Sequence, residues 1–252
     1  AGANMLSDAV KGAKPLVYVP HTKSGDVWTI DPATFQVVGK YRLGGELQHV
    51  VPSWDMKTLY ATDDTTDKVT PFDPATGLPG KNIPVTDPYN MYFTPDGKSA
   101  ISVAEARRKL VFYDPHTWQV QGELPTPQCA GIDHADYTPD GRTALFTCEF
   151  DGRIAVVDLV DRKILRTIDM PVRHMRMGPQ DIKMAPDGSV FYVAGGITEL
   201  NYNIRSSGFD VAAGDVDAKD PKGSFRGRLF VMNIGLDLRL INTRTLEVVD
   251  VI

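Results

Sequence analysis

The sequence has few cysteines, no long apolar run and no surplus of basic charge. Its two cysteines, Cys129 and Cys148, exclude a small scaffold held by several disulfides and fit either one disulfide or two free thiols. The longest uncharged run, 188–198, is far shorter than the ~20 apolar residues of a membrane-spanning helix. With 27 basic and 32 acidic residues the net charge is −5, so we expect no nucleic-acid partner.

Common catalytic motifs are also missing. The chain has no HExxH, no clustered CxxC, no nucleophile elbow and no glycine-rich phosphate loop, which argues against an enzyme without excluding one. What the chain does have is 42% hydrophobic residues, 22 glycines and 18 prolines over 252 residues. This composition is typical of one large globular domain or two small ones with many turns.

An internal repeat runs through most of the chain. An apolar strand ends in Asp and is followed by a short turn and another strand, with the Asp at positions 31, 73, 114 and 158. A second turn motif repeats with the same spacing. Its aligned positions are Trp54, Pro95, Pro139 and Pro186, and three of these four turns contain Pro-Asp-Gly. A period of about 40 to 45 residues with four short strands predicts an all-β fold, a β-propeller of four-stranded antiparallel blades. The length suits about five or six blades.

The repeats resemble a known family. The segments YVP at 18–20 and LYAT at 59–62, each followed by a strand ending in Asp, are similar to the YVTN repeats of bacterial surface and periplasmic propellers. The resemblance covers about residues 14–194. The repeats are also WD40-like. The resemblance to the YVTN family implies a periplasmic or secreted bacterial protein, and its wider relatives include haem-binding nitrite reductase propellers. Because this repeat carries unrelated functions, the resemblance indicates the fold more than the chemistry.

Aligning the blades predicts which side chains meet at the mouth of the central channel. The first strand of a blade lines the channel, and its start meets the end of the antiparallel second strand. We therefore expect one ligand-binding face that carries His21, His49, Asp64, Asn90, Glu105, His134, Glu149 and Asp181.

The chemistry of that face leaves several alternatives open. Histidine binds transition metals near neutral pH, so His21, His49 and His134 are candidate ligands of a metal or of haem. A small-molecule or protein ligand, cationic or anionic, is the other functional interpretation. A watered polar channel whose histidines merely pair with carboxylates is the alternative without a ligand.

The last part of the chain departs from the repeat. Asn242 takes the Asp position and lies 84 residues, or twice 42, after Asp158, which suggests a degenerate fifth unit followed by a sixth. A second account rests on a resemblance over about 195–252: GGITELNYNIRSSG and VMNIGLDLRLINTRTLEVVDVI are similar to part of a curli-type outer-membrane secretion channel subunit. It implies a membrane strand over 201–218 and a periplasmic strand from Phe230 onward. The alternatives are then a fusion of two sequences, a trimmed sequence, or a propeller whose last blades converged on this pattern.

These observations divide the chain into YVTN-like propeller blades at 1–194 and degenerate closing blades or a curli-channel-like segment at 195–252. The first unit begins at its second strand, so one blade is expected to have three strands. We expect a soluble binding or scaffold protein with a His- and carboxylate-lined channel mouth. The alternatives are a haem- or metal-dependent redox protein and a component of an outer-membrane secretion pore, the only case that involves a membrane.

Overall fold

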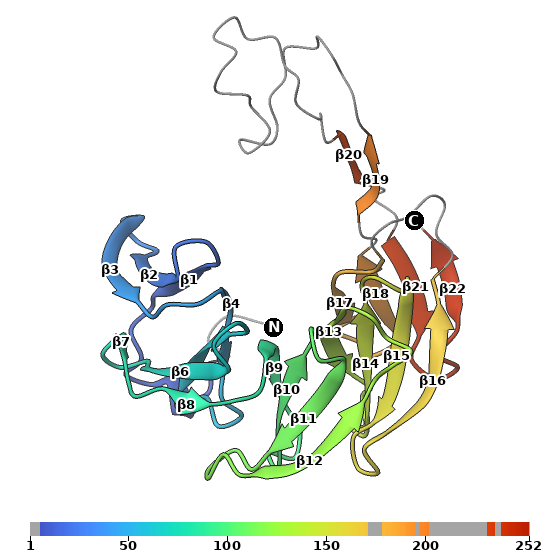
Figure 1. The fold of residues 1–252 in the computed structure, drawn as a ribbon, viewed down its shortest axis with the longest axis horizontal. Coiled ribbons are helices and arrows are strands. Elements are labelled where there is room, and N and C mark those ends of the chain that lie inside the picture. The colour runs from blue at the N-terminus through green and yellow to red at the C-terminus, as the bar shows by residue number, and fades with distance from the viewer. Residues whose placement is uncertain (1–5, 171–177, 195–196, 202–230, 235–237, 252) are drawn as a thin grey trace, which may run out of the picture.

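The computed structural model describes residues 6–170, 178–194, 197–201, 231–234 and 238–251. These residues form an all-β fold of five antiparallel sheets that follow one another around an arc (Figure 1). A short 3₁₀ helix, η1 (Asp8–Val10), precedes the first sheet. The expected all-β propeller with four-stranded antiparallel blades is confirmed: in the described part of the chain three of the five sheets on the arc have four strands, one has three and one has five, and a separate two-stranded sheet makes the sixth.

The strands run in sequence order within the first four sheets. The first sheet contains β1 (Val17–His21), β2 (Asp26–Asp31) and β3 (Gln36–Arg42). The second contains β4 (Leu47–Pro52), β5 (Leu59–Asp63) and β6 (Lys68–Asp73), with β7 (Leu78–Pro79) and β8 (Ile83–Pro84) both pairing with β6. The third contains β9 (Pro88–Phe93), β10 (Ala100–Ala104), β11 (Lys109–Tyr113) and β12 (Val120–Pro125). The fourth contains β13 (Ile132–Tyr137), β14 (Thr143–Cys148), β15 (Arg153–Asp158) and β16 (Lys163–Asp169).

The fifth sheet joins segments that are far apart in the sequence. It contains β17 (Ile182–Met184), β18 (Val190–Ala194), β21 (Leu238–Asn242) and β22 (Val248–Val251), and β18 pairs directly with β21. A separate hairpin of β19 (Ile197–Asn201) and β20 (Val231–Ile234) lies between them in the sequence. The expectation of two units after Asp158 is therefore wrong: the extra period is an insertion inside one sheet. The expected membrane strand over 201–218 lies outside the described residues, except for Asn201.

The repeat motifs make the turns that the sequence predicts. In the Pro-Asp-Gly turns, Gly97, Gly141 and Gly188 have φ angles of 70°, 68° and 73°, a region in which glycine carries no steric penalty. The turn between the third and fourth strands begins at the repeated Asp, whose side chain accepts backbone hydrogen bonds. The Asp114 carboxylate, for example, accepts from the N–H groups of His116 and Thr117 at 2.9 and 2.8 Å. Each repeat thus encodes two tight turns that return the chain within the sheet.

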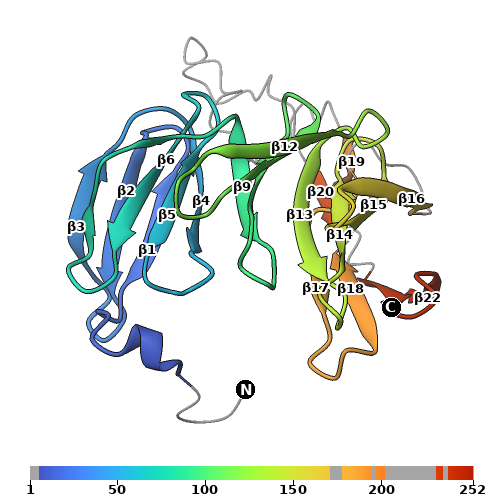
Figure 2. The same cartoon turned by 90° about the horizontal axis from the view of Figure 1, so that it is seen from below.

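The core lies between neighbouring sheets. Ile101 and Phe112 of the third sheet pack with Phe146 and Cys148 of the fourth, and all four side chains are fully buried. The innermost strands are neighbours in succession, β4 beside β9, β9 beside β13 and β13 beside β17, and the view in Figure 2 shows them along the inside of the arc.

The first sheet is incomplete in the described part of the chain, as the sequence predicts. Strand β2 carries the repeated Asp31, which marks the third strand of a blade, so β1 occupies the place of a second strand. Most of β1 is only partly buried, whereas the second strand β10 is completely buried. Strand β10 is more buried than β1 because an innermost strand, β9, pairs with it, whereas no innermost strand pairs with β1 among the described residues.

Candidate functional site

The candidate site lies at the rim where the innermost strands begin. Because first and second strands are antiparallel, Leu47 pairs with Asp63 and Ile132 with Cys148 at this rim. Residues near the start of β4, β9 and β13 therefore share the rim with residues that follow β5, β10 and β14. This is the register that the sequence alignment predicts.

Two histidines meet at this rim. The Nε2 atoms of His49, on β4, and His134, on β13, lie 3.2 Å apart, with their rings edge to face at a centroid distance of 5.1 Å. Tyr89, at the start of β9, lies between the two strands and packs its ring against His49 at 5.3 Å. The backbone carbonyl of Tyr89 contacts His49 Nδ1 at 2.9 Å. Three consecutive blades thus contribute to one cluster, which we call the histidine pair.

A buried carboxylate supports His134. Asp133 Oδ1 lies 2.6 Å from His134 Nδ1, and the Asp133 side chain is 1% exposed. Apart from this contact, neither oxygen of Asp133 has a hydrogen-bond partner among the described residues. Burial lowers the pKa of His134, but the close contact and charge of Asp133 outweigh it and the net shift is upward. Burial lowers the pKa of His49, which therefore stays neutral at physiological pH.

Several carboxylates converge around the histidine pair. The pKa of Glu105 is raised to about 7, first by burial and then by the nearby charges of Asp133, Glu149, Asp87 and Asp64. Burial, followed by the charges of the same region, also raises the pKa of the Tyr89 hydroxyl. The pKa values of Asp64, Asp87 and Glu149 are raised as well, with burial as the largest cause in each. The rim is therefore a region of concentrated, mutually repelling negative charge.

The structure groups some of the predicted residues more tightly than others. Asp181, half exposed, interacts electrostatically with both His49 and His134. Asn90 is buried and donates from Nδ2 to the Tyr92 hydroxyl at 3.1 Å. His21 makes its contacts within the first sheet, stacking on Trp28 at 4.7 Å and approaching the Asp26 carboxylate at 3.6 Å.

Three rim residues, Asp87, Tyr89 and Asp133, are missing from the prediction. Strict alternation along a strand places Asp133 and His134 on opposite faces, yet both contribute to the rim. The pairing register shifts between Ile132 and Ala135, and a similar shift occurs between Leu47 and Val50. Such an irregularity breaks the alternation and lets consecutive residues reach the same site. Nothing in the repeat pattern marks these positions in advance.

The described residues contain no group of three His, Cys, Asp or Glu side chains placed to hold a metal ion together. The structure brings together two of the three histidines predicted as metal ligands, and His21 is not joined to them in such a group. A metal ion bound by His49 and His134 therefore has no third His, Cys, Asp or Glu ligand among the described residues.

The two cysteines form a disulfide close to this rim. Cys129 and Cys148 are bonded, with a Cα–Cα distance of 4.9 Å, and both are fully buried. The bond links the segment before β13 to the end of β14 and so holds together the two elements that carry His134 and Glu149. The sequence left the redox state open.

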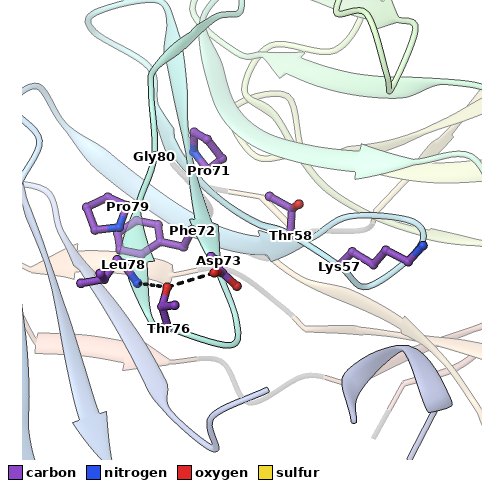
Figure 3. A pocket seen from close by; sticks show the side chains of 9 residues that line it. All are labelled: Lys57, Thr58, Pro71, Phe72, Asp73, Thr76, Leu78, Pro79 and Gly80. Carbon is purple, nitrogen blue, oxygen red and sulfur yellow. Dashed lines mark hydrogen bonds between the residues drawn. The ribbon is translucent and has the colours of Figure 1, made fainter. Parts of the chain in front are cut away.

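A surface pocket elsewhere has polar groups that are already hydrogen-bonded within the protein. The pocket, of about 490 Å³, is formed by the β6–β7 turn and the loop before β5 (Figure 3). In it the Thr76 hydroxyl donates to Asp73 Oδ2 at 3.1 Å and accepts from the Leu78 N–H at 3.3 Å, so these polar groups already serve the turn. We assign it no function.

Comparison with known proteins supports the fold. No protein-family model matches the chain. A stretch of 65 residues is 74% identical to a Caulobacter vibrioides protein named "Putative transcription activator protein HfaB"; the match covers 26% of this chain and only 19% of that protein. The structure is similar to hydrazine synthase of Kuenenia stuttgartiensis, with 16% identity and a TM-score of 0.63 over 97% of this chain and 66% of that one. It is equally similar to virginiamycin B lyase of Staphylococcus aureus, with 15% identity and a TM-score of 0.63 over 97% of this chain and 67% of that one.

At such low identity the structural likeness defines the fold alone, and the fold is that of a β-propeller. Among the described residues, no helix is both long and apolar enough to cross a membrane.

Proposed function

We propose that this propeller is a binding protein whose channel rim takes a cationic ligand. The observation that carries the proposal is the gathering of Asp64, Glu105, Asp133 and Glu149 around Tyr89, with Asp87 beside Glu105. The carboxylate of Asp133 is buried without a hydrogen bond beyond its contact with His134. A bound cation offsets the mutual repulsion of such charges and compensates their desolvation.

The aromatic ring of Tyr89 adds a second attraction for organic cations. Amines and guanidinium groups are attracted to the face of an aromatic ring as well as to carboxylates. An anionic ligand is repelled by these carboxylates, and the positive charges beside them, Arg107 near Asp87 and Lys183 near His134, are fewer than the carboxylates. The charges and the aromatic ring at the site therefore favour a cationic ligand over the anionic ligand that the sequence left open.

Titration calorimetry with spermidine as the probe tests the proposal, with succinate as the anionic comparison. We expect spermidine to bind, succinate not to bind, and the affinity for spermidine to fall with added salt. Replacing Glu105 with Gln should weaken spermidine binding by about threefold to tenfold, the effect of one partly exposed ion pair. Glu247→Gln, the same change at an exposed position away from the rim, is the matched control and should leave binding unchanged. Equal binding by the wild type and Glu105→Gln would sink the proposal.

The haem alternative fits this geometry poorly. A porphyrin held between the histidine pair needs room for its plane between the two nitrogens, which lie only 3.2 Å apart. We therefore propose no redox step through haem. The absorbance spectrum of the purified protein is the test, because a Soret band that disappears in His49→Ala and His134→Ala would restore this alternative.

We further propose an oxidising location, the periplasm or the cell exterior. A buried disulfide between Cys129 and Cys148 is typical of such compartments. The matched Caulobacter protein is named for transcription, but the negative rim repels the phosphates of nucleic acid, so we propose no such partner at this face.

The outer-membrane alternative remains a separate proposal that rests on the curli-like resemblance of the segment 195–252. It predicts ring-shaped oligomers in detergent and recovery of the protein in the outer-membrane fraction. A monodisperse monomer in buffer without detergent contradicts it.

A further inference from the structure

The protonation of the histidine pair follows from the partners of the two Nδ1 atoms. His49 Nδ1 lies 2.9 Å from the Tyr89 carbonyl oxygen, and a carbonyl can only accept, so this nitrogen carries the hydrogen. His134 Nδ1 lies 2.6 Å from the Asp133 carboxylate; the contact is an ion pair without the angles of a hydrogen bond, and this negative charge favours a proton on Nδ1. In the neutral form of each ring, Nε2 is then the atom with the free lone pair.

These two lone-pair nitrogens lie only 3.2 Å apart. Two acceptors at this distance repel unless a positive species lies between them. One such species is a proton, which makes one ring an imidazolium that donates to the other. The other is a metal ion that both nitrogens bind.

The surroundings match those of histidines that bind metals. A metal-binding imidazole typically donates its other N–H to a carboxylate or a backbone carbonyl, which fixes the ring and its tautomer. His134 has the carboxylate and His49 has the carbonyl. Two nitrogens at 2.0–2.1 Å from one metal ion are about 3.3 Å apart in a tetrahedral arrangement and about 2.9 Å apart at adjacent positions of a square-planar one, and the observed 3.2 Å lies between the two.

We propose that His49 and His134 bind one late first-row divalent metal ion through their Nε2 atoms, Cu²⁺ most tightly. The inference rests on the proposed cation site and names one cation for it. Imidazole ligands suit Cu²⁺, Ni²⁺ and Zn²⁺, and the general order of affinity places Cu²⁺ first. No third His, Cys, Asp or Glu side chain of the described residues joins the pair in a metal-binding group. Asp181, which interacts electrostatically with both rings, adds negative charge beside the ion.

The test uses the full chain without a histidine tag, freed of metal with a chelator and titrated with Cu²⁺ against glycine as a competitor. We expect one tightly bound Cu²⁺ per chain, with an electron paramagnetic resonance spectrum split by two nitrogens. His49→Ala and His134→Ala should each weaken binding by about tenfold or more, and Asp133→Asn by about tenfold through loss of ring orientation. His116→Ala, in an exposed turn, and His21→Ala are the matched controls and should bind Cu²⁺ as the wild type does.

A second measurement uses the wild type alone, in case a variant fails to fold. Imidazole ¹⁵N spectra of the metal-free protein should show both rings protonated at Nδ1, and Cu²⁺ should broaden the signals of His49 and His134 before those of His21 and His116. Unchanged Cu²⁺ affinity in both alanine variants, or broadening that spares His49 and His134, overturns the inference and leaves a shared proton as the bridging species. Spermidine binding separates the two proposals: its absence beside intact Cu²⁺ binding rejects the organic cation alone, and the reverse result rejects the metal alone.

Discussion

Glu105 shows how a single carboxyl group couples the rim to pH. Its pKa is raised to about 7 from an ordinary 4.5, chiefly by burial and next by the charge of Asp133. A carboxyl group whose pKa is higher in the folded protein than in the unfolded chain binds its proton more tightly when folded. Its contribution to stability is therefore full below pH 4.5 and is lost as the pH rises through about 7.

Replacing Glu105 with Gln should consequently make the protein more stable at pH 8 and hardly change it at pH 4.5. We expect a gain on the order of 1 kcal/mol in the free energy of unfolding at pH 8, after allowing for solvent screening of a partly exposed group. Urea unfolding at a series of pH values measures it, with Glu247→Gln as the control. A gain of the same size at both pH values, or a loss at pH 8, contradicts the electrostatic origin of the effect.

At the scale of the structural element, the third and fourth strands of each blade are joined by the same turn. The side chain of the repeated Asp, or of Asn242 in the fifth sheet, accepts a hydrogen bond from the backbone N–H two residues later. The N–H of Ala33 donates to Asp31 Oδ1 at 2.8 Å, and the N–H of Arg244 donates to Asn242 Oδ1 at 2.9 Å. The residue four positions after each acid has positive φ: 56° at Phe35, 75° at Gly77, 60° at Trp118, 48° at Arg162 and 56° at Leu246. A left-handed residue costs about 1–2 kcal/mol unless it is glycine.

This turn predicts that Phe35→Gly stabilises the protein. Phe35 is 81% exposed, so its ring contributes little to the core, and glycine relieves the strain at φ 56°. Because glycine also raises the entropy of the unfolded chain, the expected net gain is only about 0.5–1 kcal/mol. Gln36→Gly, at the first residue of β3, is the control and should lower the stability by a similar amount. Thermal unfolding of both variants measures the difference in sign.

Such turns explain why most of the fold is predictable from the sequence. Asp31, Asp73, Asp114 and Asp158 recur because each satisfies the same turn, and the spacing of these residues gives the blades. The same spacing is ambiguous at Asn242, since an insertion within one sheet and an extra blade both add a period. Only the pairing of β18 with β21 decides between them.

The rim was predictable in part for a related reason. The positions of His49, His134, Glu105 and Glu149 follow from strand register, which repeats from blade to blade. The contact between the two histidines depends on how closely three blades approach, and the role of Asp133 depends on a local register shift. Neither is encoded in the repeat period.

At the scale of the whole molecule, the five sheets differ in how completely they are buried. The second and third strands of the third and fourth sheets, β10, β11, β14 and β15, are almost wholly buried between their neighbours. In the first sheet β1 is mostly half-buried, and β2 alternates between buried and half-buried residues. Stability should therefore fall toward the first sheet, because local opening is easiest where the fewest apolar groups are buried.

Hydrogen exchange measured by mass spectrometry tests this gradient. Strand β2 is the fairest reporter, because it pairs on both sides, with β1 and β3, as its counterparts β11 and β15 pair with their own neighbours. Unequal exchange among these three strands therefore reflects how easily each sheet opens and not a missing hydrogen bond. We expect β2 to exchange before β11 and β15 under native conditions. Exchange of all three strands at one rate would show instead that the first, third and fourth sheets open as a single cooperative unit, and that the edge of β1, which pairs with no further strand among the described residues, has no cost for β2.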